Sequence, residues 1–223
     1  MAMSFFRKGD GGLDTIAAHT VSMLAEARHS FDLSSMALLS GADVDAVAND
    51  VRATDERINQ AEQDLRGELV VHVSVHGSDD IGEVLGYTLL IKKIERIGDQ
   101  AKNILDLAEE GVDLSSASDI AELSAIRQTI SEMMSEAAEL LNEHNQERAD
   151  AYRANADALR GQLEGRIREC MHSESPGHEI VPRAILFRYW KRIVANLGSV
   201  VTTATEPLQT KGYHDDGETD IDD

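Results

Sequence analysis

Apolar residues recur every three, four or seven positions through most of this 223-residue chain, in segments far longer than a typical strand. Spacing of this kind places apolar side chains along one face of an α-helix. The pattern predicts six helices, each about 25 residues or roughly 38 Å long. They cover residues 13–39, 43–69, 81–110, 118–144, 147–171 and 182–207. Helices of uniform length with near-seven apolar repeats are typical of bundles with shallow crossing angles.

Composition agrees with a helical fold. Aromatic residues make up only 4% of the chain, and there are three prolines. The β-branched stretch Leu69–Val75 could form a strand, but no second strand-like segment exists to pair with it, so we expect it to continue the second helix. The sixth helix is predicted to begin at Pro182, a favourable first-turn residue. Residues 172–180 give the longest loop signal of the second half.

The chain divides into two similar halves. Met23–Ala27 and Met133–Ala137 occupy matching places, and a cluster of Gly, Asp and Ser at 111–118 marks a boundary. We predict an all-α fold of two tandem three-helix bundles, with one repeat at 13–111 and the other at 117–207. Residues 208–223 are predicted to form a disordered acidic tail.

Charge and cysteine content exclude several classes of protein. The net charge is -20, whereas attraction to nucleic acid requires a basic face. Anionic lipid headgroups would repel such a chain, and no apolar run approaches the roughly 20 residues needed to span a membrane. The start of the chain does not resemble a signal peptide, so we expect a cytoplasmic protein. Cys170 is the single cysteine; we expect a buried structural thiol, not a nucleophile.

The segment with the clearest chemical signal lies in the third predicted helix. Glu95 and Asp99 are four residues apart and therefore lie on one face, beside the apolar stripe. Gly98, between them, costs about 1 kcal/mol of helix propensity relative to Ala. A glycine here would let a neighbouring helix or a ligand approach the backbone.

The second predicted helix carries a possible partner set. Asp55, Asn59 and Glu62 follow one line at the edge of its apolar stripe. If the two helices pack together, their oxygen atoms would suit a hard cation such as iron, manganese, magnesium or calcium. The alternative is that Lys92 pairs with Glu95 and Lys102 with Asp99, on a solvated face.

Glu95–Ala101, followed by Asn103 and Ile104, closely resembles the signature of the PhoU family of phosphate-signalling proteins, with Gln100 in the place of a His. Asp55, Ile58, Asn59 and Glu62 resemble the family's other motif, with Asn59 in the place of an acid. The resemblance implies two three-helix bundles, often binding metal through their acidic motifs. It makes Glu95, Asp99 and Asp55 the candidate metal ligands.

The second half departs from the signature. Lys191 stands where the family has Glu and Ala195 where it has Asp, so we expect at most one metal centre. Members of the family are cytoplasmic, tend to self-associate, and restrain phosphate uptake by contacting a phosphate transporter and a sensor histidine kinase. The resemblance therefore implies a non-enzymatic regulator that forms a homodimer.

Two further features have alternative interpretations. Glu26–His29 and Glu169–His172 both read Glu-x-x-His, the spacing used by di-iron bundles. His29 lies about 120° from its helix's apolar stripe, so we expect no di-iron site. The segment Arg188–Arg192 contains Tyr189 and Trp190. We expect either that Tyr189 is core and the rest surface, or that the cluster anchors a partner or dimer contact.

Three functions fit the sequence. The first is a regulator of phosphate transport and phosphate-starvation signalling that acts through protein contacts and could sense a metal. The second is a metal-dependent phosphoester hydrolase at the acidic motifs. The third is a metal-free helical protein that only oligomerises.

Overall fold

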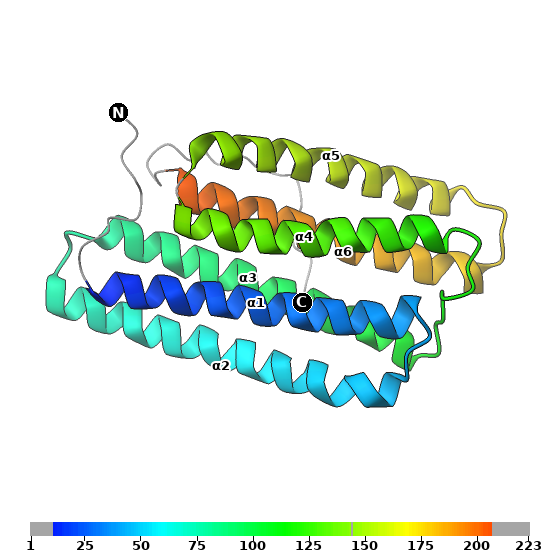
Figure 1. Cartoon of the computed structure of the whole chain (residues 1–223), viewed down its shortest axis with the longest axis horizontal. Helices are drawn as coiled ribbons and strands as arrows, with labels where there is room; N and C mark the ends of the chain where they lie inside the picture. Colours follow the sequence, from blue (N-terminus) through cyan, green and yellow to red (C-terminus); the bar gives the residue numbers. More distant parts are fainter. Residues whose placement is uncertain (1–10, 144, 207–223) are drawn as a thin grey trace.

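Six long helices account for almost all of the computed structural model, which describes residues 11–143 and 145–206. Within those residues there is no strand, which confirms the all-α prediction (Figure 1). None of the described helices has an apolar stretch long enough to cross a lipid bilayer. The helices, in order, are α1 (Gly11–Leu39), α2 (Val44–His76), α3 (Ile81–Glu109), α4 (Ile120–Glu143), α5 (Gln146–Met171) and α6 (Gly177–Thr205).

The first three helices pack against one another along the predicted apolar stripes. α1 lies against both α2 and α3, and α2 lies against α3. Met23 and Phe31 of α1, Val51 and Ile58 of α2 and Ile94 of α3 are all removed from solvent. Burying apolar surface of this size is the main force that holds such a bundle together.

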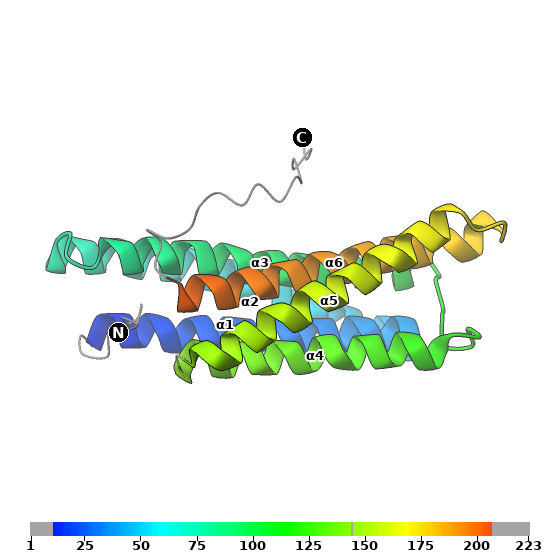
Figure 2. The same ribbon diagram turned by 90° about the horizontal axis from the view of Figure 1, so that it is seen from above.

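The last three helices form a more open arrangement. α5 packs along α6, and α4 packs against α6. The backbones of α4 and α5 lie further apart, and these two helices meet through long side chains, such as Tyr152, whose hydroxyl donates to the Met133 carbonyl. Figure 2 shows α5 crossing obliquely from α4 towards α6. The main contacts between the halves are those of α1 with α4 and of α3 with α6.

Polar side chains reinforce the contact between α1 and α4. An Arg127 guanidinium nitrogen lies 3.0 Å from Asp32 Oδ1. The Ser131 hydroxyl donates to Asp32 Oδ2 at 3.2 Å, and Arg28 Nε donates to Ser131 Oγ at 3.0 Å. α4 therefore places a guanidinium group beside Oδ1 of Asp32 and a hydroxyl donor at Oδ2, and this pairing fixes the register between the two helices.

Two helix boundaries differ from the sequence-based expectation. α2 continues to His76, so Leu69–Val75 is helical as expected, and the helix ends at Gly77 with φ 76°. α6 begins at Gly177, not at Pro182, because Pro176 acts as its N-cap and accepts from the backbone N–H of Glu179 and Ile180. Pro182 sits inside the helix near its exposed start. The predicted loop at 172–180 is therefore wrong beyond residue 176.

The apolar stripe of α6 predicted that Tyr189 lies in the core and Trp190 at the surface, and the structure shows the reverse. Trp190 is fully buried and packs edge-on against Phe187 at 6.0 Å between ring centroids, whereas Tyr189 is only partly buried. The buried face of α6 is wider than the predicted stripe because the helix packs on both α3 and α5, so that Leu186 and Trp190 are buried as well as Ile193. Cys170 is partly buried, and burial raises the pKa of its thiol. The predicted acidic tail at 208–223 lies outside the described residues.

Candidate functional site

The two acidic motifs meet where α2 packs on α3, and a glycine makes that close contact possible. A Cβ atom added at Gly98 would lie 2.9 Å from Ile58 Cδ1 and 3.4 Å from Ile58 Cγ2. Ile58 is itself fully buried. Of the two roles predicted for this glycine, the structure therefore supports the approach of a neighbouring helix.

One lysine bridges the two helices at the first end of the site. Lys92 Nζ of α3 lies 2.7 Å from Glu95 Oε2 and 3.7 Å from Glu62 Oε1 of α2. The same Glu62 oxygen lies 2.7 Å from an Arg66 guanidinium nitrogen. Glu62 and Glu95 are both buried, so these cations offset the cost of removing two carboxylates from water.

A second lysine bridges the helices at the other end. Lys102 Nζ of α3 donates to Asp55 Oδ2 of α2 at 2.9 Å, and Asn59 Nδ2 lies 3.5 Å from the same oxygen. Burial alone would lower the pKa of Lys102, but the hydrogen bond and charge of Asp55 outweigh it, so that this pKa is raised. The ammonium group therefore stays charged at neutral pH, facing a buried carboxylate.

Asp99 lies between the two lysine-bridged pairs and is only partly buried. Desolvation raises its pKa, and the negative charge of Glu95 raises it further, while Lys102 acts in the opposite direction. The charged form of Asp99 is thus held at an energetic cost, one helical turn from a second carboxylate.

The predicted metal ligands Glu95, Asp99 and Asp55 occur in this region, but they do not form a ligand set as arranged here. Among the described residues, no three His, Cys, Asp or Glu side chains are grouped so as to hold a metal ion. The carboxylates of Asp55 and Glu95 instead face lysine ammonium groups. A hard cation at these three residues stays a prediction, and it requires Lys92 and Lys102 to move aside.

A polar groove of about 640 Å³ opens beside this site, between α3 and α6. Its walls include Arg96 and Lys102 on one side and Tyr189 and Arg192 on the other. Arg192, and Arg188 one turn before it, form no ion pair with any other residue in the described part of the chain. In a chain with 41 acidic and 21 basic residues, two neighbouring arginines without such pairs are unusual.

The segment of α6 where the second acidic motif was expected contains Lys191, which forms an ion pair with α5. Lys191 Nζ lies 3.7 Å from Glu164 Oε2 of α5, and Ala195 carries no side-chain oxygen. α6 therefore provides a lysine where the first half has the acid Glu95.

The sequence did not reveal the lysine bridges between α2 and α3, because lysine spacing along one helix says nothing about the helix opposite. Lys102, for example, bonds to Asp55 and not to Asp99 as its spacing suggested.

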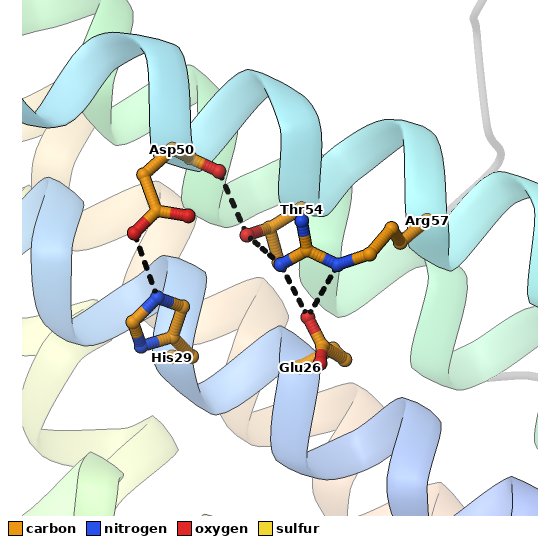
Figure 3. Close-up of polar contacts among 5 residues, drawn as sticks. All are labelled: Glu26, His29, Asp50, Thr54 and Arg57. Carbon is orange, nitrogen blue, oxygen red and sulfur yellow. Dashed lines mark hydrogen bonds and ion pairs between the residues drawn. The ribbon is translucent and has the colours of Figure 1, made fainter.

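The Glu26–His29 motif joins α1 to α2 (Figure 3). His29 Nε2 lies 3.1 Å from Asp50 Oδ2, and Arg57 donates to Glu26 Oε2 from both Nε and Nη2, at 3.1 and 2.7 Å. Arg57 also donates to Thr54 Oγ1 at 2.8 Å. Both members of the motif are therefore engaged by α2 side chains at the protein surface.

Comparison with known proteins finds one matching family and a matching solved structure. Residues 19–108, less than half of the chain, match the family model described as PhoU domain. The fold matches the crystal structure of PhoU from Pseudomonas aeruginosa with a TM-score of 0.72, over 86% of this chain and 95% of that one, at 19% sequence identity. No curated protein matches the sequence. The predicted family resemblance is confirmed for residues 19–108, and the structural match shows that the second half shares the all-α fold.

Proposed function

We propose, from the PhoU domain formed by residues 19–108, that this chain regulates phosphate transport and phosphate-starvation signalling by binding other proteins. The observation that carries the proposal is that the matched region contains both acidic motifs and brings them together at the contact between α2 and α3. The partners we propose are a phosphate transporter, a phosphate-sensing histidine kinase, or both, in the cytoplasm. We also propose that the chain self-associates as a dimer.

The groove between α3 and α6 is the surface we assign to the partner. It collects arginines from both halves in a chain that is otherwise strongly acidic. Arginine and tyrosine are among the residues that contribute most to protein interfaces. A partner segment bearing Asp or Glu could form charge-assisted hydrogen bonds with Arg188 and Arg192.

The site geometry favours a binding role over the hydrolase alternative. A metal-dependent hydrolase must present a cation and a water molecule to its substrate. Here the carboxylates that would hold the cation already pair with lysine and arginine side chains, from Lys102 at Asp55 to Arg66 at Glu62. The arrangement is that of a polar contact between two helices.

Deletion and complementation in the source cell test this function. Deleting the gene should raise phosphate uptake and starvation-reporter activity in phosphate-replete medium, and the intact gene should restore both. A variant with Arg188→Glu and Arg192→Glu should express normally but fail to restore them. Arg168→Glu is the matched control, because this exposed arginine on α5 lies away from the groove.

Two results would count against the proposal. Unchanged uptake after deletion would remove the regulatory role. Full complementation by the double arginine variant would leave the role in place but move the partner surface elsewhere. Capture of the transporter or kinase with tagged wild-type protein, compared with the same variant, separates these outcomes.

A further inference from the structure

Two exposed leucines extend the face of α3 that lines the groove between α3 and α6. Leu85 is 52% exposed and Leu89 is 46% exposed. Leu89 lies seven residues before Arg96, and Leu85 lies one turn further back, so the three side chains leave α3 in nearly the same direction. Arg96 lines the groove. Single exposed leucines are common on protein surfaces, but two neighbouring ones that continue a charged groove indicate a contact surface.

The α6 side of the groove supplies positive charge that the described chain does not neutralise. Arg188 is exposed and Arg192 is partly buried, one helical turn apart. Neither guanidinium group pairs with a carboxylate among the described residues, whereas the ammonium groups of Lys92 and Lys102 face carboxylates of α3 and α2. A guanidinium group can bind a carboxylate through two parallel hydrogen bonds. Arg188 and Arg192 are therefore available to the carboxylates of another molecule.

The length and shape of this surface match a helix. α3 and α6 pack along each other (Figure 2), and the groove is lined by residues of both. Leu85 and Asn103, at the two ends of the surface, are 18 positions apart, which is about 27 Å along α3. A ligand helix of about 18 residues has the same length. Docking of an amphipathic helix into a groove is a recurring way for one protein to recognise another.

We propose that the partner assigned to this groove binds through one amphipathic, acidic helix. Its apolar side chains pack on Leu85 and Leu89, and its Asp or Glu side chains pair with Arg188 and Arg192. This inference rests on the proposed function, because it names the chemistry of the partner at the same surface. A second copy of this chain would bring a net charge of -20 to the contact, whereas an acidic helix brings only the few charges that the arginines neutralise.

Photocrosslinking of the full chain in the source cell tests the proposal. Leu89→benzoylphenylalanine and Arg188→benzoylphenylalanine, introduced one at a time, should each crosslink to the proposed transporter or kinase. Mass spectrometry should place both crosslinks in one helical segment of that protein, near apolar residues for position 89 and near Asp or Glu for position 188. Val71→benzoylphenylalanine is the matched control. Val71 is also apolar and exposed, but it lines a different crevice between α1 and α2, so it should not label that segment.

A synthetic peptide of the crosslinked segment then measures each part of the contact by fluorescence anisotropy. Its affinity for the purified chain should fall at least about tenfold with Leu85→Glu plus Leu89→Glu, because carboxylates replace the apolar contact. Arg188→Glu with Arg192→Glu should cause a similar loss, and added salt should weaken binding to the wild type. Val71→Glu should leave the affinity unchanged within about twofold.

Several results would overturn the proposal. Crosslinks from positions 89 and 188 to different segments, or to a basic segment, would show that no single acidic helix covers this face. Crosslinks within one chain or between two copies would make this protein its own occupant, and lipid adducts at position 89 would assign the leucines to a membrane. Absence of crosslinks at both positions, or peptide affinity that survives the leucine variant, would place the contact elsewhere. The regulatory role fails separately, if deletion leaves phosphate uptake unchanged.

Discussion

Asp99 is the residue of the acidic site whose charged form is disfavoured by its surroundings. It has the negative neighbours Glu95 and Asp55 and is partly buried, so its carboxyl has a raised pKa. Lys102, the cation that does most to lower this pKa, is already bonded to Asp55. The charged side chain therefore contributes little to the stability of the folded protein. Its replacement is for that reason a direct test of what the site does.

Replacing Asp99 with Asn should stabilise the protein at neutral pH. A carboxyl whose pKa is higher in the folded than in the unfolded protein binds more protons when folded, so stability falls as the pH rises through that interval. We expect Asp99→Asn to raise the Tm by about 1–2 °C at pH 7. The gain should vanish once the pH is low enough for Asp99 to be protonated in both states. Thermal melts from acid to neutral pH measure this.

Asp113 provides the contrast, because the backbone N–H of Ser115 lowers the pKa of this exposed carboxyl. Asp113→Asn should therefore give no gain at pH 7. If Asp99 binds a metal ion, in contrast, its replacement should reduce stability whenever the metal is present. Adding manganese or iron would raise the Tm of the wild type, and Asp99→Asn would blunt the rise, because a ligand bound to the folded state stabilises it.

At the scale of elements, the contact between α2 and α3 depends on one missing side chain. Gly98 lets the buried Ile58 approach the α3 backbone, and the two lysine bridges lie on either side of this point. A wider separation of the helices would stretch both bridges. Packing and electrostatics are therefore coupled at this contact.

Gly98→Ala should destabilise the protein even though alanine is the better helix former. Overpacking a buried contact costs about 1–3 kcal/mol, against about 1 kcal/mol gained in helix propensity. Ile58→Val removes the Cδ1 atom that lies closest, so in the double variant the alanine should cost much less. Urea unfolding of the four proteins of this double-mutant cycle measures the coupling.

Gly67→Ala on α2 is the matched control, because nothing lies within 4 Å of a Cβ atom at Gly67. It should be neutral or stabilising by up to about 1 kcal/mol. Equal destabilisation by Gly98→Ala with isoleucine and with valine at position 58 would show that the Ile58 contact is not the cause.

At the scale of the whole molecule, excess negative charge opposes the compact state. The chain carries 41 acidic and 21 basic residues. Most of its described ion pairs are exposed, and pairs of this kind contribute little to stability. Long-range repulsion between the remaining carboxylates is screened by salt.

Raising the ionic strength should therefore stabilise the protein. We expect the Tm to rise by roughly 5 °C between about 20 mM and about 1 M KCl, because the Debye length falls below the spacing of surface charges. Choline chloride at equal concentration should have a similar effect if screening is the cause. A Tm that stays constant or falls with salt would show that the local ion pairs outweigh the general repulsion.

Much of this architecture could be predicted because helical periodicity is a local property. The stripes through Met23, Val51 and Ile193 are buried as expected, and the two acidic motifs lie at the contact between α2 and α3. The misses are tertiary. The bond from Lys102 to Asp55 and the burial of Trp190 depend on which helix lies opposite, and the spacing of residues along one chain segment does not contain this information. The early start of α6 depended on Pro176 as the cap.

The pairing of helices across the middle of the molecule has an implication for its ancestry. The first helix lies against the fourth and the third against the sixth, so helices that hold the same place in the two predicted repeats lie side by side. Like-with-like contact is what a two-fold homodimer of a single three-helix chain would use. A duplicated gene encoding such a dimer needs only a short connection, here around residues 110–119, to become one polypeptide. In such a history each copy could diverge alone, and Lys191 in the second half, where the resemblance places the counterpart of Glu95, is the kind of difference expected.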